Sequence, residues 1–225
     1  MPVRQITFSD LRLVMVLLLL SLGPTARPSA AFTTVGRATA KDPTSSTATE
    51  APSQQADTAD PRGTVAGQTY KNAFLGLEFA LPEDLQFEEQ PTAQIDPATG
   101  LRIISIHAGS KPGNRFAFKK YIVDKAIMFV ADPLARHPVD ERTDAGYMRS
   151  MVRVEKSEGF KQSGDNSVSK IGETPFSRAE FVHGNRHHVV FTTQRKDYAF
   201  VFIFVVNDVV TADALAKSMS LKLPQ

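Results

Sequence analysis

Residues 198–206 read Tyr-Ala-Phe-Val-Phe-Ile-Phe-Val-Val, and this stretch decides the fold. Successive side chains of a β-strand point to opposite faces of a sheet, so the aromatic residues of this run line one face and the aliphatic residues line the other. An antiparallel strand with one solvated face alternates apolar with polar residues, and this run does not. It therefore belongs at the centre of a sheet that is covered on both faces.

Short alternating segments on the N-terminal side of this run predict an antiparallel sheet. The turns that separate them contain Gly184-Asn185 and Lys196-Asp197, which suit tight hairpins. The predicted strands are residues 69–72, 77–81, 101–108, 125–131, 168–171, 175–183, 186–195 and 198–206. Residues 110–124 are expected to form a loop.

Two helices are predicted beside the sheet. Thr143 or Asp144 can cap a helix that runs to Ser157, and a second helix covers about residues 211–219. The predicted fold class is α+β: a single domain in which helices cover both faces of an antiparallel sheet, as an α/β/α sandwich.

The N-terminal 31 residues have the organisation of a signal peptide. Arg4 and Arg12 precede an apolar run over residues 13–23, which is shorter than the roughly 20 residues that a membrane-spanning helix needs. Ser29 and Ala31 predict cleavage before Phe32. We expect an exported chain, periplasmic or secreted, with no transmembrane span after cleavage; a retained anchor is the alternative.

Residues 32–66 are predicted to form a disordered tether ahead of a folded domain at 67–225. Ala, Thr, Ser and Pro supply 21 of these 35 residues. Such a composition buries too little apolar surface to offset the loss of chain entropy on folding.

Composition excludes several function classes. The chain has no cysteine, which excludes disulfides, thiol catalysis and thiolate metal ligands. The formal net charge of the chain is +2, and residues 1–31 carry all of it. The mature chain is therefore close to neutral, and its net charge does not favour nucleic acid binding. The sequence also lacks the short motifs of zinc peptidases, serine hydrolases and nucleotide-binding folds. No cofactor and no metal site are predicted.

Three motifs resemble those of a known family. They are Gly67-x-x-Tyr70-x-Asn72-x-x-Leu75-Gly76-Leu77-x-Phe79-x-Leu81-Pro82, the helix with Gly146-Tyr147, and Gly172-x-x-Pro175-Phe176-x-Arg178. They resemble small exported bacterial domains of unknown function, which are similar to the PsbP-like proteins of photosystem II and to the Ran-binding import factor Mog. The resemblance implies an α/β/α sandwich and a binding or assembly role, and it transfers no functional residue.

One candidate site lies on the hairpin around Gly184-Asn185. This turn pairs Val182 with His187, which places Arg178, Glu180 and His187 on one face. The guanidinium could bind an anionic ligand with Glu180 orienting it, or the pair could be a structural ion pair. His183 and His188 share the opposite face, where neither strand supplies a carboxylate, so a metal site is not expected there.

The other candidate is an interaction surface in the segment between the predicted strands 101–108 and 125–131. Basic and aromatic side chains alternate there and could dock on a protein or an envelope component, or the aromatic residues could pack into the domain. Its residues are Lys111, Arg115, Phe116, Phe118, Lys119, Lys120 and Tyr121.

The function expected is an exported, non-catalytic binding or assembly module. The alternative is a small metal-dependent or small-molecule hydrolase at the His/Arg/Glu hairpin.

Overall fold

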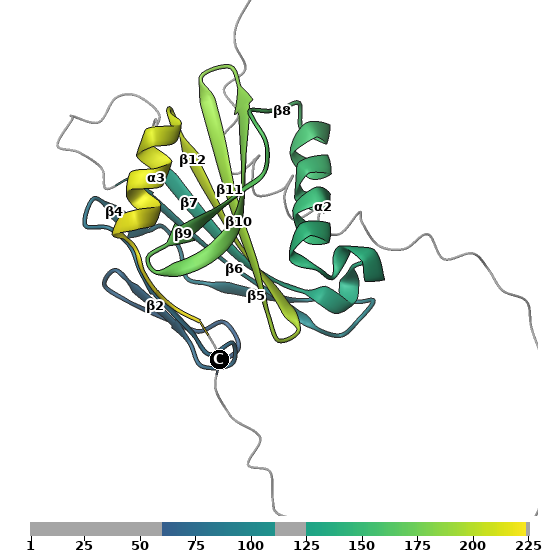
Figure 1. The fold of residues 1–225 in the computed structure, drawn as a ribbon. Coiled ribbons are helices and arrows are strands. Elements are labelled where there is room, and N and C mark those ends of the chain that lie inside the picture. Colours follow the sequence, from purple (N-terminus) through teal and green to yellow (C-terminus); the bar gives the residue numbers. More distant parts are fainter. Residues whose placement is uncertain (1–59, 111–124, 224–225) are drawn as a thin grey trace, which may run out of the picture. The chain divides into compact units, whose positions relative to one another are not determined.

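The computed structural model describes residues 60–110 and 125–223, all of which belong to one compact unit. A large antiparallel sheet has the order β4-β6-β7-β12-β11-β10-β8, while β5 also pairs with β6 and β9 with β10 (Figure 1). Its strands are β4 (Leu85–Phe87), β5 (Thr92–Ile95), β6 (Arg102–Ser110), β7 (Ala126–Pro133), β8 (Lys161–Gln162), β9 (Ser167–Ile171), β10 (Thr174–His183), β11 (Arg186–Arg195) and β12 (Tyr198–Val206).

A second, smaller sheet joins the two ends of the described chain. Its order is β1-β2-β3-β13, so the last strand of the chain pairs with β3 near its beginning. These strands are β1 (Thr64–Ala66), β2 (Thr69–Asn72), β3 (Leu77–Ala80) and β13 (Ser220–Lys222). The sequence predicted the β2–β3 hairpin but neither β1 nor β13. Because β1 is paired with β2, ordered structure begins before residue 67, inside the range assigned to the tether.

Strand β12 is central, as its sequence predicts. It pairs with β11 on one side and β7 on the other, so that Phe202 lies opposite both Phe191 and Phe129. Phe200, Phe202 and Phe204 are each at most 1% exposed. The antiparallel α+β class is therefore confirmed for the described residues.

The two faces of β12 belong to two separate hydrophobic clusters. Ala199, Val201 and Ile203 pack with Tyr147, Met148 and Met151 of α2 (Asp144–Ser157). The phenylalanines on the other face pack with α3 (Val209–Ser218) and with the small sheet. Figure 1 shows α2 and α3 on either side of the strands. One helix thus packs against each cluster, with the small sheet sharing one of them, and the α/β/α layering stays a prediction.

Both predicted helices are present, with one shifted start. The Thr143 hydroxyl accepts a hydrogen bond from the Gly146 amide at 3.1 Å, as a helix cap should. The second helix begins at Val209, two residues early, because Asp208 and not a later residue caps it by accepting from the Thr211 amide at 2.7 Å. No helix of the described ranges is long and apolar enough to cross a membrane.

Two 3-10 turns, η1 (Leu134–Arg136) and η2 (Val139–Glu141), connect β7 to α2. Gly146 in the first turn of α2 lies against η2. A Cβ atom at this position would lie 2.1 Å from the Asp140 carbonyl oxygen and 2.8 Å from the Glu141 Cα. The missing side chain is what allows η2 and α2 to approach.

Gly146→Ala should therefore destabilise the protein by about 3 kcal/mol, since backbone atoms must move to admit one methyl group. Urea unfolding followed by circular dichroism would measure the loss. The control is Ala145→Ser at the exposed neighbouring position, which should change stability by about 0.5 kcal/mol or less. Equal stabilities for the two variants would contradict this account of the contact.

Candidate functional site

A cluster of buried polar side chains is centred on Asp132, near the end of β7. The side chain of Asp132 is fully buried. Its Oδ1 accepts a hydrogen bond from Arg136 Nη1 at 2.8 Å, and its Oδ2 accepts from His137 Nε2 at 2.7 Å and from the Tyr147 hydroxyl at 2.8 Å. A buried carboxylate requires such donors, because nothing else there replaces its hydration.

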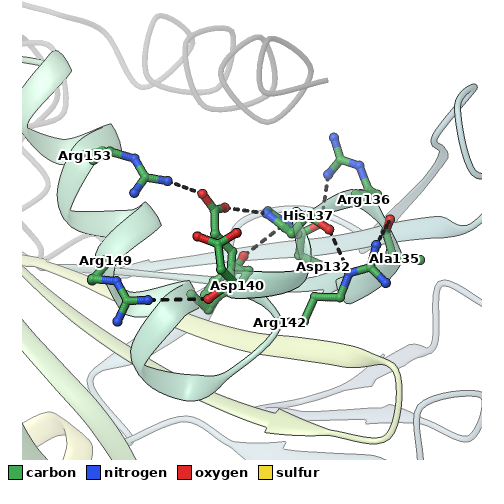
Figure 2. A network of polar contacts seen from close by, with 10 residues as sticks. Asp132, Ala135, Arg136, His137, Asp140, Arg142, Arg149 and Arg153 are labelled. Carbon is green, nitrogen blue, oxygen red and sulfur yellow. Dashed lines mark hydrogen bonds and ion pairs between the residues drawn. The ribbon is translucent and has the colours of Figure 1, made fainter. Parts of the chain in front are cut away.

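The cluster extends outward from His137 to α2. The second ring nitrogen of His137, Nδ1, lies 3.4 Å from Glu141 Oε2, and Arg153 of α2 pairs with the other oxygen of Glu141. Figure 2 shows this chain of contacts running from Asp132 to Arg153. One set of side chains thus connects β7, both 3-10 turns and α2.

Arginines complete the cluster on its other sides. Arg136 Nε lies 3.4 Å from Asp96 Oδ1, which attaches the loop after β5. Arg142 donates to the backbone carbonyls of His137 at 2.7 Å and Ala135 at 3.2 Å, which fixes the turn between η1 and η2 (Figure 2).

The pairing moves the pKa values of the buried groups in opposite directions. Burial alone would raise the pKa of Asp132, but the hydrogen bond and charge of His137, with help from Arg136 and Tyr147, lower it. Burial alone would lower the pKa of His137, but its contacts with Asp132 and Glu141 raise it. Burial and the nearby Asp132 charge raise the pKa of Tyr147 well above its usual range. The arrangement favours an imidazolium held between two carboxylates.

This set of side chains includes types used in acid–base catalysis, but its geometry fits a structural role better. His137 is 6% exposed and Tyr147 1%. Both imidazole nitrogens face carboxylates and both oxygens of Asp132 accept from protein donors, so the shared protons stay within the cluster. General acid–base catalysis needs a group within reach of substrate.

Sequence reasoning missed this cluster. The sequence identifies Tyr147 only through the Gly146-Tyr147 motif, and the predicted strand 125–131 ends one residue before Asp132. The available signal was an acidic residue directly after a buried strand, followed four and five residues later by Arg136 and His137. That spacing matches a turn that folds back onto the strand end.

The predicted register of the β10–β11 hairpin is correct. Val182 lies opposite His187, and Arg178, Glu180 and His187 share a face. Arg178 Nη1 donates to Glu180 Oε1 at 2.5 Å, and Nη2 donates to Asp213 Oδ1 of α3 at 3.0 Å. The guanidinium carbon also lies 5.8 Å from the centre of the Phe191 ring.

The structure brings together two of the three predicted residues of this face. No hydrogen bond joins His187 to Arg178 or Glu180 within the described part of the chain, and its buried Nδ1 has no partner there. Asp213, which the sequence did not identify, holds α3 against the face. Arg178 is 8% exposed, so this is a covered ion-pair cluster that connects a strand to a helix.

The opposite face of the hairpin carries a second buried pair. His188 Nδ1 donates to Glu155 Oε2 of α2 at 2.9 Å, and the Phe160 ring stacks on the imidazole with centroids 3.9 Å apart. The carboxylate that neither strand supplies comes from the helix. Over residues 60–110 and 125–223 no group of three or more His, Asp or Glu residues is placed to hold a metal ion.

The predicted basic and aromatic interaction surface, Lys111 to Tyr121, lies outside the described residues. The structure does fix the two residues that flank residues 111–124. The Ser110 amide donates to the Lys125 carbonyl at 3.0 Å, and the Lys125 amide donates to the Ser110 hydroxyl at 3.2 Å. Lys125 also pairs with Asp84. The segment therefore leaves and re-enters the sheet at one point.

Comparison with known proteins gives partial structural likenesses. The sequence matches no known family profile and no curated protein. Among solved structures it is similar to cyanobacterial PsbP (CyanoP) from Synechocystis sp. PCC 6803, with 14% identity, a TM-score of 0.43 and coverage of 71% of this chain and 95% of that one. It is also similar to LpqN, involved in cell envelope biogenesis of Mycobacterium tuberculosis, with 10% identity, a TM-score of 0.29 and coverage of 66% and 83%. Both TM-scores lie below 0.5, so they do not establish a shared family.

The Asp132–His137 contact should make the free energy of unfolding decrease at both acidic and alkaline pH. The lowered pKa of Asp132 contributes stability above its usual value of about 3.9, and this is lost as the pH falls through the lowered native pKa. The raised pKa of His137 contributes stability below its usual value of about 6.5, and this is lost as the pH rises through the raised native pKa. The contribution is greatest between these limits.

His137→Gln tests the alkaline side. The wild type should exceed the variant in free energy of unfolding at pH 5.5. The difference should shrink at pH 8, because this stabilisation is lost progressively as the pH rises above about 6.5 toward the raised native pKa. Urea unfolding at both pH values measures it. If the variant does not fold, the ring-proton NMR titration of His137 in the wild type gives the same information. A titration midpoint below the usual histidine range would contradict the prediction.

Arg178→Met should destabilise the protein by about 1–3 kcal/mol, because it leaves the Glu180 carboxylate beside an apolar strand without its cation. Asp213→Asn is the control. Its side chain is 52% exposed, so solvent screens its contact and the expected loss is below about 1 kcal/mol. Thermal or urea unfolding would rank the two, and the reverse order would contradict a role for Arg178 as the buried centre of this cluster.

Proposed function

We propose that the chain is an exported, non-catalytic binding or assembly module that acts in the cell envelope or outside the cell. The proposal includes a PsbP-like α/β/α layering of its folded domain. One observation carries it: the central side chains of the Asp132 and Arg178 clusters are buried and bound to other side chains of the domain. The donors and acceptors of Asp132 and His137 are used by neighbouring side chains, and the Arg178 cluster is closed by Asp213 of α3. Such clusters stabilise elements and leave recognition to the surface.

The interaction surface proposed for the partner is the segment from Lys111 to Tyr121. It carries four positive charges and three aromatic rings, a composition that suits an anionic or amphipathic protein or envelope component. The hydrogen bonds between Ser110 and Lys125 support this proposal, since they join the two residues that flank the segment at the end of the paired strands β6 and β7.

A variant with Lys111, Arg115, Lys119 and Lys120 all changed to Gln should lose a partner that the wild type retains. The partner is sought by chemical crosslinking in intact cells, followed by mass spectrometry of species that co-purify in a saturable amount. Loss of the crosslink without loss of thermal stability supports the proposal. A partner whose crosslinks are unchanged by the four substitutions would move the surface elsewhere, and complete absence of saturable partners, with intact membranes included, would overturn the binding module.

The second candidate is a small-molecule or metal-dependent hydrolase at the hairpin. Arg178 Nε and His187 Nδ1 are both buried without a hydrogen-bond partner among the described residues, which is a feature of some ligand sites. Metal analysis of the purified chain and activity assays of Glu180→Ala and His187→Ala would test it. Bound metal, or a hydrolase activity that these changes abolish, would favour the enzyme over the binding module.

A further inference from the structure

The outward face of α2 carries a row of cationic side chains. At 100° per residue, five positions fall within an arc of about 100° on the helix. They are Ala145, Arg149, Val152, Arg153 and Lys156. Arg149 and Lys156 are exposed, and the Arg153 side chain is 58% exposed. We name these three cations, with Ala145 and Val152 beside them at one edge of the arc, the α2 cationic face.

No acidic residue of α2 lies on this face. Asp144 and Glu155 fall outside the arc, and Glu155 is buried against His188. The separation of charges around the helix is therefore not the mixed pattern of an ordinary solvated surface, where both signs alternate.

The cations of this face are largely free of carboxylate partners. Within the described ranges, Arg149 makes one hydrogen bond, a long one of 3.5 Å to the Asp140 backbone carbonyl, and Lys156 has no ion pair. Arg153 pairs with the carboxylate of Glu141, which His137 also contacts, and it is the one cation of this face with a carboxylate partner among residues 60–110 and 125–223. Figure 2 shows Arg149 and Arg153 extending from α2 toward η2.

From this charge distribution we propose that the α2 cationic face docks an acidic polypeptide segment in extended conformation. Arg149 and Arg153 are four residues apart, which is about one helical turn and about 6 Å along the axis. Alternate side chains of an extended chain repeat at about 6.6–6.8 Å, so two carboxylates at alternate positions can meet Arg149 and Arg153. Guanidinium groups also bind carboxylates in a bidentate manner.

An anionic bilayer fits this face less well. Helices that lie on membranes carry large apolar side chains such as Trp, Phe or Leu on the face that contacts lipid. The apolar residues of the α2 cationic face are Ala145 and Val152 at its edge, and Val152 packs partly against the core, while the bulky apolar residues of α2 are buried against the sheet. The inference goes beyond the proposed function, because it assigns a second surface and a partner chemistry that do not involve residues 111–124.

Fluorescence anisotropy provides the test, with a labelled 12-residue peptide in which Glu alternates with Ser and a matched peptide in which Gln replaces Glu. The protein is expressed from its full coding sequence and purified as exported. The triple variant Arg149→Gln, Arg153→Gln, Lys156→Gln should weaken binding of the Glu peptide by about tenfold or more. The matched triple variant Lys170→Gln, Lys217→Gln, Lys222→Gln removes the same charge from β9, α3 and β13 and should weaken it by less than about threefold.

Two further arms separate the alternatives. The double variant Arg149→Gln, Lys156→Gln keeps the Arg153–Glu141 pair and serves if the triple variant does not fold. It should also weaken binding of the Glu peptide. Vesicles of phosphatidylglycerol should bind the wild type and the α2 triple variant alike. The variant with Lys111, Arg115, Lys119 and Lys120 changed to Gln is assayed with the same peptides. The inference is overturned by equal weakening in the two triple variants, by equal binding of the Glu and Gln peptides, or by a loss of binding in that fourfold variant alone. That last outcome would leave the proposed binding module standing.

Discussion

Both faces of strand β12 must be kept from water, and the rest of the structure depends on this requirement. Its phenylalanines face one hydrophobic cluster and its aliphatic residues face another, so the sheet needs a cover on each side. Helix α2 supplies one cover, and α3 with the small sheet supplies the other. The ion-pair clusters lie where these covers meet strands: Asp132 and His137 beside α2, and Arg178 with Asp213 of α3. Apolar burial sets the layers, and directional contacts fix how each helix sits on them.

The two covers also explain why Arg178 and His188, which are candidate site residues in the sequence, are buried in the fold. A buried Arg178 or His188 would be costly without a partner, and the covering helices provide carboxylates through Asp213 and Glu155. The outer surfaces are then free of that structural demand. Arg149 and Lys156, on which the proposed docking face rests, are exposed and lie outside these clusters.

The sequence was sufficient for what depends on local periodicity. The alternation of Tyr198–Val206 placed the central strand, and the turn Gly184-Asn185 gave the register of the β10–β11 hairpin. Contacts between elements far apart in the chain were out of reach, because periodicity does not say which helix faces which strand. Asp213 is 35 residues from Arg178, and Glu155 is 33 residues from His188. Strand β13 was missed because only its pairing with the distant β3 makes it a strand, and β1 was missed because its three residues carry no alternation and lie in a stretch whose composition predicts a tether.

The paired backbone of Ser110 and Lys125 has an evolutionary consequence. When both ends of an insertion are already joined, lengthening it adds only loop-closure entropy, about 0.6 kcal/mol for each doubling. Residues between such ends can be exchanged, extended or shortened while β6 and β7 keep their register. The β6–β7 connection is thus a natural grafting position, at which related chains could acquire new specificities and at which an engineer could insert a foreign recognition loop.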